Sequence, residues 1–214
     1  MLASGRPFVG LENLLALSWS AGVPVVHLRI FPWPQKRMAA MTVRVGERSV
    51  VLLAKDAVYP AWIAFYLAHE LAHIALDHIE ADEALVDLDD DQPLTENGDD
   101  EERSADTWAL ELLTGRTSPN VLPTGAAASA RALAYAAQSS AHGLGIEPGT
   151  LALCFGYSTG EWAVANGSLK AIYSKPAPVW RAINSVARSQ LALSACPPEA
   201  SDFLFKVLEL DAVG

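Results

Sequence analysis

The chain has 214 residues, a formal net charge of −10, 51% hydrophobic residues and 19% charged residues. At this length a compact soluble protein can bury a full hydrophobic core. No apolar run approaches the ~18 residues of a membrane span, and the acidic balance argues against direct binding of nucleic acid.

Residues 8–22 are predicted to form an amphipathic helix near the start of the chain. Its apolar residues fall at helical spacing: Leu11, Leu14, Leu15 and Trp19. Glu12 and Asn13 interrupt the apolar stretch and so argue against a signal peptide. Cys154 and Cys196 suit reduced core thiols better than a disulfide framework. We therefore expect a cytoplasmic protein without a membrane partner.

Three apolar or alternating stretches then predict strands, at residues 23–30, 38–45 and 49–54. Gly46-Glu47 separates the last two and suits a tight hairpin, with glycine at a position of positive φ. We expect a small antiparallel sheet of about three strands.

Residues 56–78 predict a helix that carries the most informative motif, His69-Glu70-Leu71-Ala72-His73. Pro60 suits the first helical position. Four residues of helix turn through about 400°, so both imidazoles leave one face, as two ligands of a single zinc ion require. Glu70 lies beside them and can take a proton from an activated water. A helix with two histidines on a wet face is the alternative, but apolar neighbours surround the pair, and buried histidines need a partner.

A hydrolytic zinc site takes a third protein ligand. His78 follows His69 by nine residues, which on a continuous helix places it about 180° away, so we interpret it as a C-terminal helix residue favoured by the dipole. Zinc deformylase chemistry would need a cysteine ligand upstream of this helix, and no cysteine precedes Cys154.

Residues 102–115 predict a second helix, which is acidic in its first turn. Four of its residues share one stripe: Glu102, Ala105, Asp106 and Ala109. The alanines allow close approach to the first helix, so Glu102 is the predicted third ligand, and Asp106 can accept a proton from a ligand histidine and fix its tautomer. Glu101 is the nearby alternative, but its neighbours form no such stripe.

Between the two helices the chain is strongly acidic, and residues 80–106 hold 13 of the 25 acidic residues. We predict a solvated, mobile loop over residues 84–102. The alternative is an electrostatic guide for a basic partner, such as the DNA-binding arm of a repressor.

After Gly115 the pattern becomes helical, with helices predicted at residues 126–141, 147–155, 161–173, 178–193 and 198–210. We expect a metallopeptidase core over residues 1–115 and a helical C-terminal subdomain over residues 116–214. The helical part can equally complete the core. His142, Tyr157 and Tyr173 are of a type that stabilises an oxyanion, and none is assigned that role.

The two motifs together resemble the ImmA/IrrE family of zinc metallopeptidases, which pairs His-Glu-x-x-His with Glu-x-x-Ala-Asn-x-Phe-Ala-x-x-Leu-Leu. The second motif here is Glu102-x-x-Ala105-Asp106-x-Trp108-Ala109-x-x-Leu112-Leu113. The resemblance implies that His69, His73 and Glu102 bind Zn²⁺ and that Glu70 is the general base. Aspartate replaces the usual asparagine and keeps the acceptor.

The resemblance covers roughly residues 20–115, and together with the sequence pattern it predicts an α+β, zincin-like fold, in which a small antiparallel sheet and the metal-site helices precede an all-helical C-terminal portion. It also implies a zinc endopeptidase that cleaves a regulatory protein, such as a helix-turn-helix repressor of mobile-element or stress genes. The alternative is a protein-interaction module that binds a regulator without robust cleavage.

Overall fold

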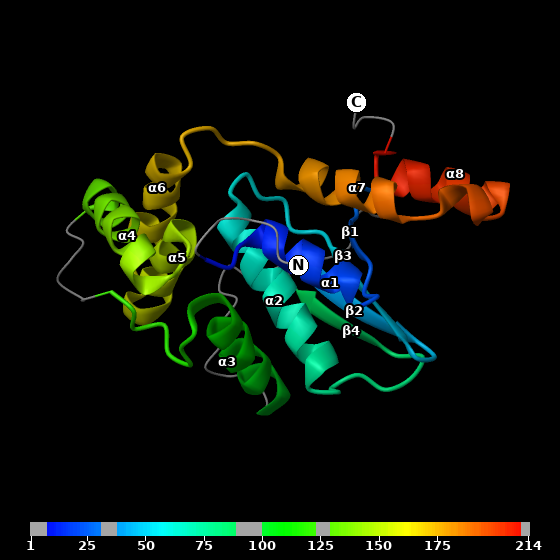
Figure 1. Ribbon diagram of the computed structural model, residues 1–214, viewed down its shortest axis with the longest axis horizontal. Helices are drawn as coiled ribbons and strands as arrows, with labels where there is room; N and C mark the ends of the chain where they lie inside the picture. The colour runs from blue at the N-terminus through cyan, green and yellow to red at the C-terminus, as the bar shows by residue number, and fades with distance from the viewer. Residues whose placement is uncertain (1–7, 31–37, 89–99, 123–128, 211–214) are drawn as a thin grey trace.

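The computed structural model describes residues 8–30, 38–88, 100–122 and 129–210. The fold is α+β, as expected, and combines one small sheet with a larger share of helix (Figure 1). The predicted helices are all present, with ends shifted by a few residues. They are α1 (Leu11–Ser20), α2 (Pro60–Ala75), α3 (Asp100–Thr114), α4 (Ala130–Leu144), α5 (Pro148–Thr159), α6 (Trp162–Ile172), α7 (Val179–Gln190) and α8 (Pro198–Val207).

The sheet contains four strands in the order β1-β3-β2-β4. Their bounds are β1 (Val25–His27), β2 (Met38–Val45), β3 (Arg48–Leu53) and β4 (Ala84–Leu88). The predicted hairpin is confirmed, because β2 and β3 pair antiparallel and Gly46 between them has a φ of 57°.

The expectation of a purely antiparallel sheet was wrong, since β1 runs parallel to β3, with Val26 opposite Leu52. The hairpin leaves one outer edge on each of its strands, and β1 pairs with the edge of β3 rather than with β2, the strand that follows it in the chain. The outer edge of β2 is then available to β4.

The acidic segment between α2 and α3 is not a loop throughout, contrary to the prediction for residues 84–102. Residues 84–88 form β4, which pairs antiparallel with β2 and places Leu85 opposite Thr42 and Asp87 opposite Ala40. The backbone hydrogen bonds of an edge strand depend little on side-chain charge, so an acidic composition does not prevent pairing. Helix α3 begins at Asp100, and the predicted loop at residues 89–99 lies outside the described residues.

Helix α2 is the central element of the molecule and packs against β2, β3, α1 and α3 (Figure 1). Pro60 occupies its first turn, where a missing backbone N–H costs no hydrogen bond. Almost every side chain from Ala61 to His73 is buried, so this helix is enclosed on most sides. Polar groups on such a helix must find partners inside the protein.

Helix α3 lies beside α2 (Figure 1). Ala105 and Ala109 are fully buried between the two helices, as the alanine stripe predicted. This close approach brings the first turn of α3 to the C-terminal half of α2.

The helices after α3 form two groups. Helices α4, α5 and α6 pack together at one end of the molecule around a core that includes Leu133, Leu151 and Leu169 (Figure 1). Helix α7 instead packs on β1 and α1, and the α8 region covers Val26 through Leu208. No helix in the described ranges combines the length and apolarity needed to cross a membrane.

Candidate metal centre

The two histidines of the His-Glu-x-x-His motif face each other at the C-terminal half of α2. Their Nε2 atoms lie 3.0 Å apart, and their side chains are 4% and 0% exposed for His69 and His73. The helical spacing of four residues places the rings one turn apart on the same face, as expected.

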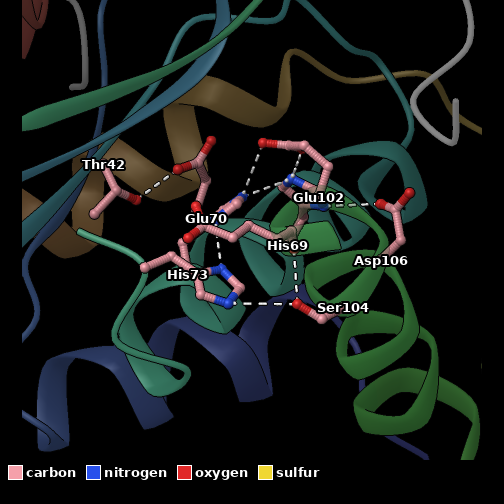
Figure 2. Close-up of polar contacts among 9 residues, drawn as sticks. Thr42, His69, Glu70, His73, Glu102, Ser104 and Asp106 are labelled. Atoms are coloured by element: carbon pink, nitrogen blue, oxygen red, sulfur yellow. Dashed lines mark hydrogen bonds and ion pairs between the residues drawn. The ribbon is translucent and has the colours of Figure 1, made fainter. Parts of the chain in front are cut away.

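Glu102, in the first turn of α3, brings its carboxylate to both rings. Its Oε2 lies 3.2 Å from Nε2 of His69, and its Oε1 lies 3.6 Å from Nε2 of His73 (Figure 2). The three candidate ligand atoms all lie within 4.8 Å of one another. The side chain of Glu102 is 37% exposed, so the group opens to solvent on the α3 side. Glu101 is exposed and does not belong to this group.

Asp106 stands one helical turn beyond Glu102 and contacts the other nitrogen of His69. Its Oδ1 lies 2.9 Å from Nδ1 of His69, so this carboxylate accepts the Nδ1–H and leaves Nε2 to face the group. Burial lowers the pKa of His69, but the bonds to Asp106 and Glu102 outweigh it and raise the pKa to about 10. The surroundings of His69 therefore favour a positive charge at this position.

Glu70 has two oxygens in different surroundings. Its Oε2 accepts a hydrogen bond of 2.5 Å from the hydroxyl of Thr42 on β2, and its Oε1 is buried without a hydrogen-bond partner among the described residues. Burial, helped by the charges of Asp87 and Glu102, raises the pKa of Glu70 to about 8. A nearby cation would favour the ionised form.

His78 contacts His73, although helical phase had placed it on the opposite face of the helix. That prediction was wrong because α2 ends at Ala75 and the backbone turns back at Asp77, which has a φ of 59°. Nδ1 of His78 consequently lies 3.0 Å from Nδ1 of His73, on the side of the ring away from Glu102. Its Nε2 lies 3.3 Å from Oγ of Ser104 on α3.

These residues fit a zinc ion. Zinc bound to two imidazoles at ~2.0–2.1 Å in a tetrahedral arrangement separates the nitrogens by roughly 3.3 Å. The distances among the two Nε2 atoms and the Glu102 oxygens run from 3.0 to 3.6 Å. With its Nδ1 bonded to Asp106, His69 turns its Nε2 toward the Nε2 of His73 and the carboxylate of Glu102. The positive charge that these groups favour can be supplied by a metal ion in place of the proton on His69.

Sequence reasoning missed four contributors to this centre: Thr42, His78, Asp87 and Ser104. Thr42 and Asp87 lie on paired strands and His78 on the loop after α2, and Ser104 on α3 joins them only through its contact with His78, so periodicity along one helix reports none of these contacts. Among the oxyanion candidates, Tyr173 donates to Glu147 over 2.7 Å and His142 is exposed on α4, whereas the buried Tyr157 packs its ring on Phe65, one turn before His69 on α2.

A comparison with family models shows to which family the chain belongs. Residues 27–147 match the model for peptidase U49, which is more than half of the chain. The chain belongs to the peptidase U49 family. The matched region extends from the end of β1 to the start of α5 and contains both metal-site helices, so this U49 peptidase has its candidate metal centre inside the family region. No curated protein and no solved structure matches the chain.

Proposed function

We propose that this U49 peptidase is a zinc-dependent endopeptidase. The observation that carries the proposal is the convergence of two buried imidazoles and one carboxylate beside a glutamate with an unpartnered oxygen. This combination supplies what zinc-dependent peptide hydrolysis needs, since the three ligands hold the ion and the glutamate moves the proton. Family membership supports the reaction class.

The roles divide among the residues by their positions. His69, His73 and Glu102 hold the ion, and Asp106 keeps His69 in the tautomer that directs Nε2 to it. When bound, zinc lowers the pKa of a coordinated water and polarises the scissile carbonyl. The partly exposed side chain of Glu102 marks the side of the group that is open to solvent, where a substrate can enter.

Glu70 is the general base in this proposal. The hydroxyl of Thr42 holds Oε2 and so orients the carboxylate, while Oε1 takes a proton from the attacking water and passes it to the leaving amine. The cation beside it favours the ionised carboxylate, which the reaction needs at neutral pH.

The edge of β4 supports the binding of an extended peptide. Within the described residues β4 pairs with β2 and lies at the end of the sheet order, so its outer edge can accept another strand. Asp87 on this strand lies close enough to Glu70 to raise the pKa of its carboxylate, which places β4 beside the candidate centre. A substrate strand paired there would run past the metal position.

The proposed substrate is a DNA-binding regulatory protein, such as a helix-turn-helix repressor, which would place the reaction in the cytoplasm. The resemblance of the two motifs to the ImmA/IrrE family supports this substrate. The acidic residues near the centre, including Asp87, complement a basic partner.

Glu70→Gln tests the proposed reaction. The variant should bind zinc as the wild type does and lose cleavage of the repressor by at least ~100-fold, because the proton acceptor is absent and the ligands are intact. The measurements are metal content of the purified proteins and the appearance of cleaved repressor with time. Equal cleavage by the variant would contradict the mechanism. Zinc and repressor binding without cleavage by either protein would favour the interaction module.

A further inference from the structure

The loop after α2 holds His78 in a defined place. The backbone N–H of His78 donates to the carbonyl of His73 over 3.0 Å, and that of Asp77 donates to the carbonyl of Ile74 over 3.3 Å. These two bonds form a Schellman motif, with Asp77 in the left-handed position that usually belongs to glycine. The chain therefore reverses direction after α2 and brings the ring of His78 against the ring of His73.

Arg44 on β2 fixes this loop from the other side. Its Nη1 donates to Oδ1 of Asp77 and to the carbonyl of Ile79, both over 2.7 Å. The side chain of Ile79 is buried and anchors the following residue. The backbone on both sides of His78 is thus fixed, at Asp77 and at Ile79. The imidazole of His78 therefore loses little conformational entropy when it contacts His73.

The protons along this chain of contacts can be assigned from one carbonyl. Oγ of Ser104 lies 2.8 Å from the carbonyl of Glu101, which only accepts, so Ser104 donates there and accepts from Nε2–H of His78. A neutral His78 with its proton on Nε2 presents an unprotonated Nδ1 to His73. His73 then donates its Nδ1–H to His78 across the 3.0 Å contact, and in its neutral form it carries no proton on Nε2.

We propose that His78 is a positioning residue for the metal centre: it accepts the Nδ1–H of His73 and thereby holds Nε2 of His73 ready for the ion. The inference rests on the proposed function, in which His73 is a ligand. It gives α3 two supporting roles in addition to its ligand Glu102. Asp106 orients His69 directly, and Ser104 orients His73 through His78.

The tautomer of His73 in the metal-free protein tests this inference without any metal. The chain has five histidines, so ¹⁵N-labelled imidazoles can be assigned one at a time by substitution. We expect His73 to carry its proton on Nδ1 in the wild type and to shift toward the Nε2–H form in His78→Leu. A wild-type His73 protonated on Nε2 would overturn the inference, whether or not the protein proves to be a zinc peptidase.

Zinc affinity, measured by competition with a chromophoric chelator, provides the second readout. His78→Leu should weaken zinc binding by about 10- to 100-fold, since lost support of a ligand histidine has this effect. His78→Asn should restore most of the loss, because its Oδ1 can accept at the place of Nδ1, and Ser104→Ala should show a smaller loss. His142→Leu, at an exposed histidine of α4, is the matched control.

Two outcomes are decisive in the affinity measurement. Unchanged zinc affinity in a folded His78→Leu protein would refute the positioning role. If the wild type binds no zinc at all, the proposed function fails while the tautomer measurement still decides the role of His78.

Discussion

At the scale of single residues, burial of the ionised carboxylate of Glu70 lowers the free energy of unfolding of the metal-free protein. A pKa of about 8 lies above the ordinary value of 4.5, so the folded state holds this proton more tightly than the unfolded state does. Glu70 therefore destabilises the metal-free protein progressively as pH rises from about 4.5 to about 8.

We expect metal-free Glu70→Gln to be more stable than the metal-free wild type at pH 8, by about 1 kcal/mol or more, because glutamine never ionises. Near pH 4.5 the two proteins should unfold with similar free energies. Urea unfolding in chelator-treated buffer at both pH values measures this difference. A difference that shrinks as pH rises would contradict the assignment.

Glu102 and Glu101 are adjacent in the sequence but differ in their surroundings. Glu102 contacts both histidines, whereas Glu101 is exposed. Glu102→Gln should lower zinc affinity by at least ~100-fold, because an amide oxygen is a weaker ligand and carries no charge. Glu101→Gln removes the same charge from an exposed neighbour and should change affinity less than 3-fold. Chelator competition on both variants measures the contrast, and equal losses would indicate a purely electrostatic effect.

At the scale of elements, the contact between α2 and α3 depends on side chains small enough to let the helices touch. Ala105→Leu should overpack this contact, destabilise the protein by about 1–3 kcal/mol and weaken zinc binding, because Glu102 moves away from the histidines. Thr107→Leu, on the exposed face of the same helix, is the control. Denaturant unfolding and chelator competition together test the prediction, which fails if Ala105→Leu alters neither quantity.

The elements also show which parts of the site a sequence can predict. The spacing of His69 and His73, and that of Glu102 and Asp106, follow from the period of one helix, and the alanines of α3 indicate which face meets α2. The approach of His78 to His73 depends instead on a left-handed backbone at Asp77, a conformation that aspartate adopts only in some contexts. Thr42 and Asp87 depend on strand pairing between distant segments, which local alternation does not specify.

The sheet follows the same division between local and distant contacts. The β2–β3 hairpin was predictable because Gly46 lies between two apolar strands, and the turn closes a short loop. The parallel pairing of β1 with β3 and the recruitment of β4 were not, since each joins segments that other elements separate in the chain. The pairing of β4 with β2 gives the sheet its edge beside the candidate centre.

At the scale of the whole molecule, Asn184 ties the C-terminal helices to the sheet. Its Oδ1 accepts from the backbone N–H of His27 over 2.8 Å, and its Nδ2 donates to the carbonyls of His27 and Leu208 over 2.8 and 2.7 Å. Asn184 is fully buried, so no solvent can replace these bonds. One side chain thus joins β1, α7 and the end of the α8 region.

Asn184→Leu should destabilise the protein by about 2–5 kcal/mol, since it leaves one backbone N–H and two carbonyls buried without partners. Zinc affinity of the folded variant should stay within a few-fold of wild type, because α7 contributes nothing to the metal ligands. Asn166→Leu, at an exposed asparagine of α6, should cost less than about 1 kcal/mol. Thermal unfolding of the three proteins distinguishes the two sites.

The division of the proposed ligands between α2 and α3 makes the ion a crosslink. His69 and His73 come from α2, and Glu102 comes from α3, about 30 residues later in the chain. The ion would therefore bind only when α2 and α3 are packed together. By mass action, zinc at 100 times its dissociation constant would then add ~2.7 kcal/mol to the free energy of unfolding. Removing zinc should speed amide hydrogen exchange in the first turns of α3 before it affects β2 or β3. Zinc binding and folding would then be thermodynamically linked, so that the free energy of unfolding would depend on the concentration of free zinc.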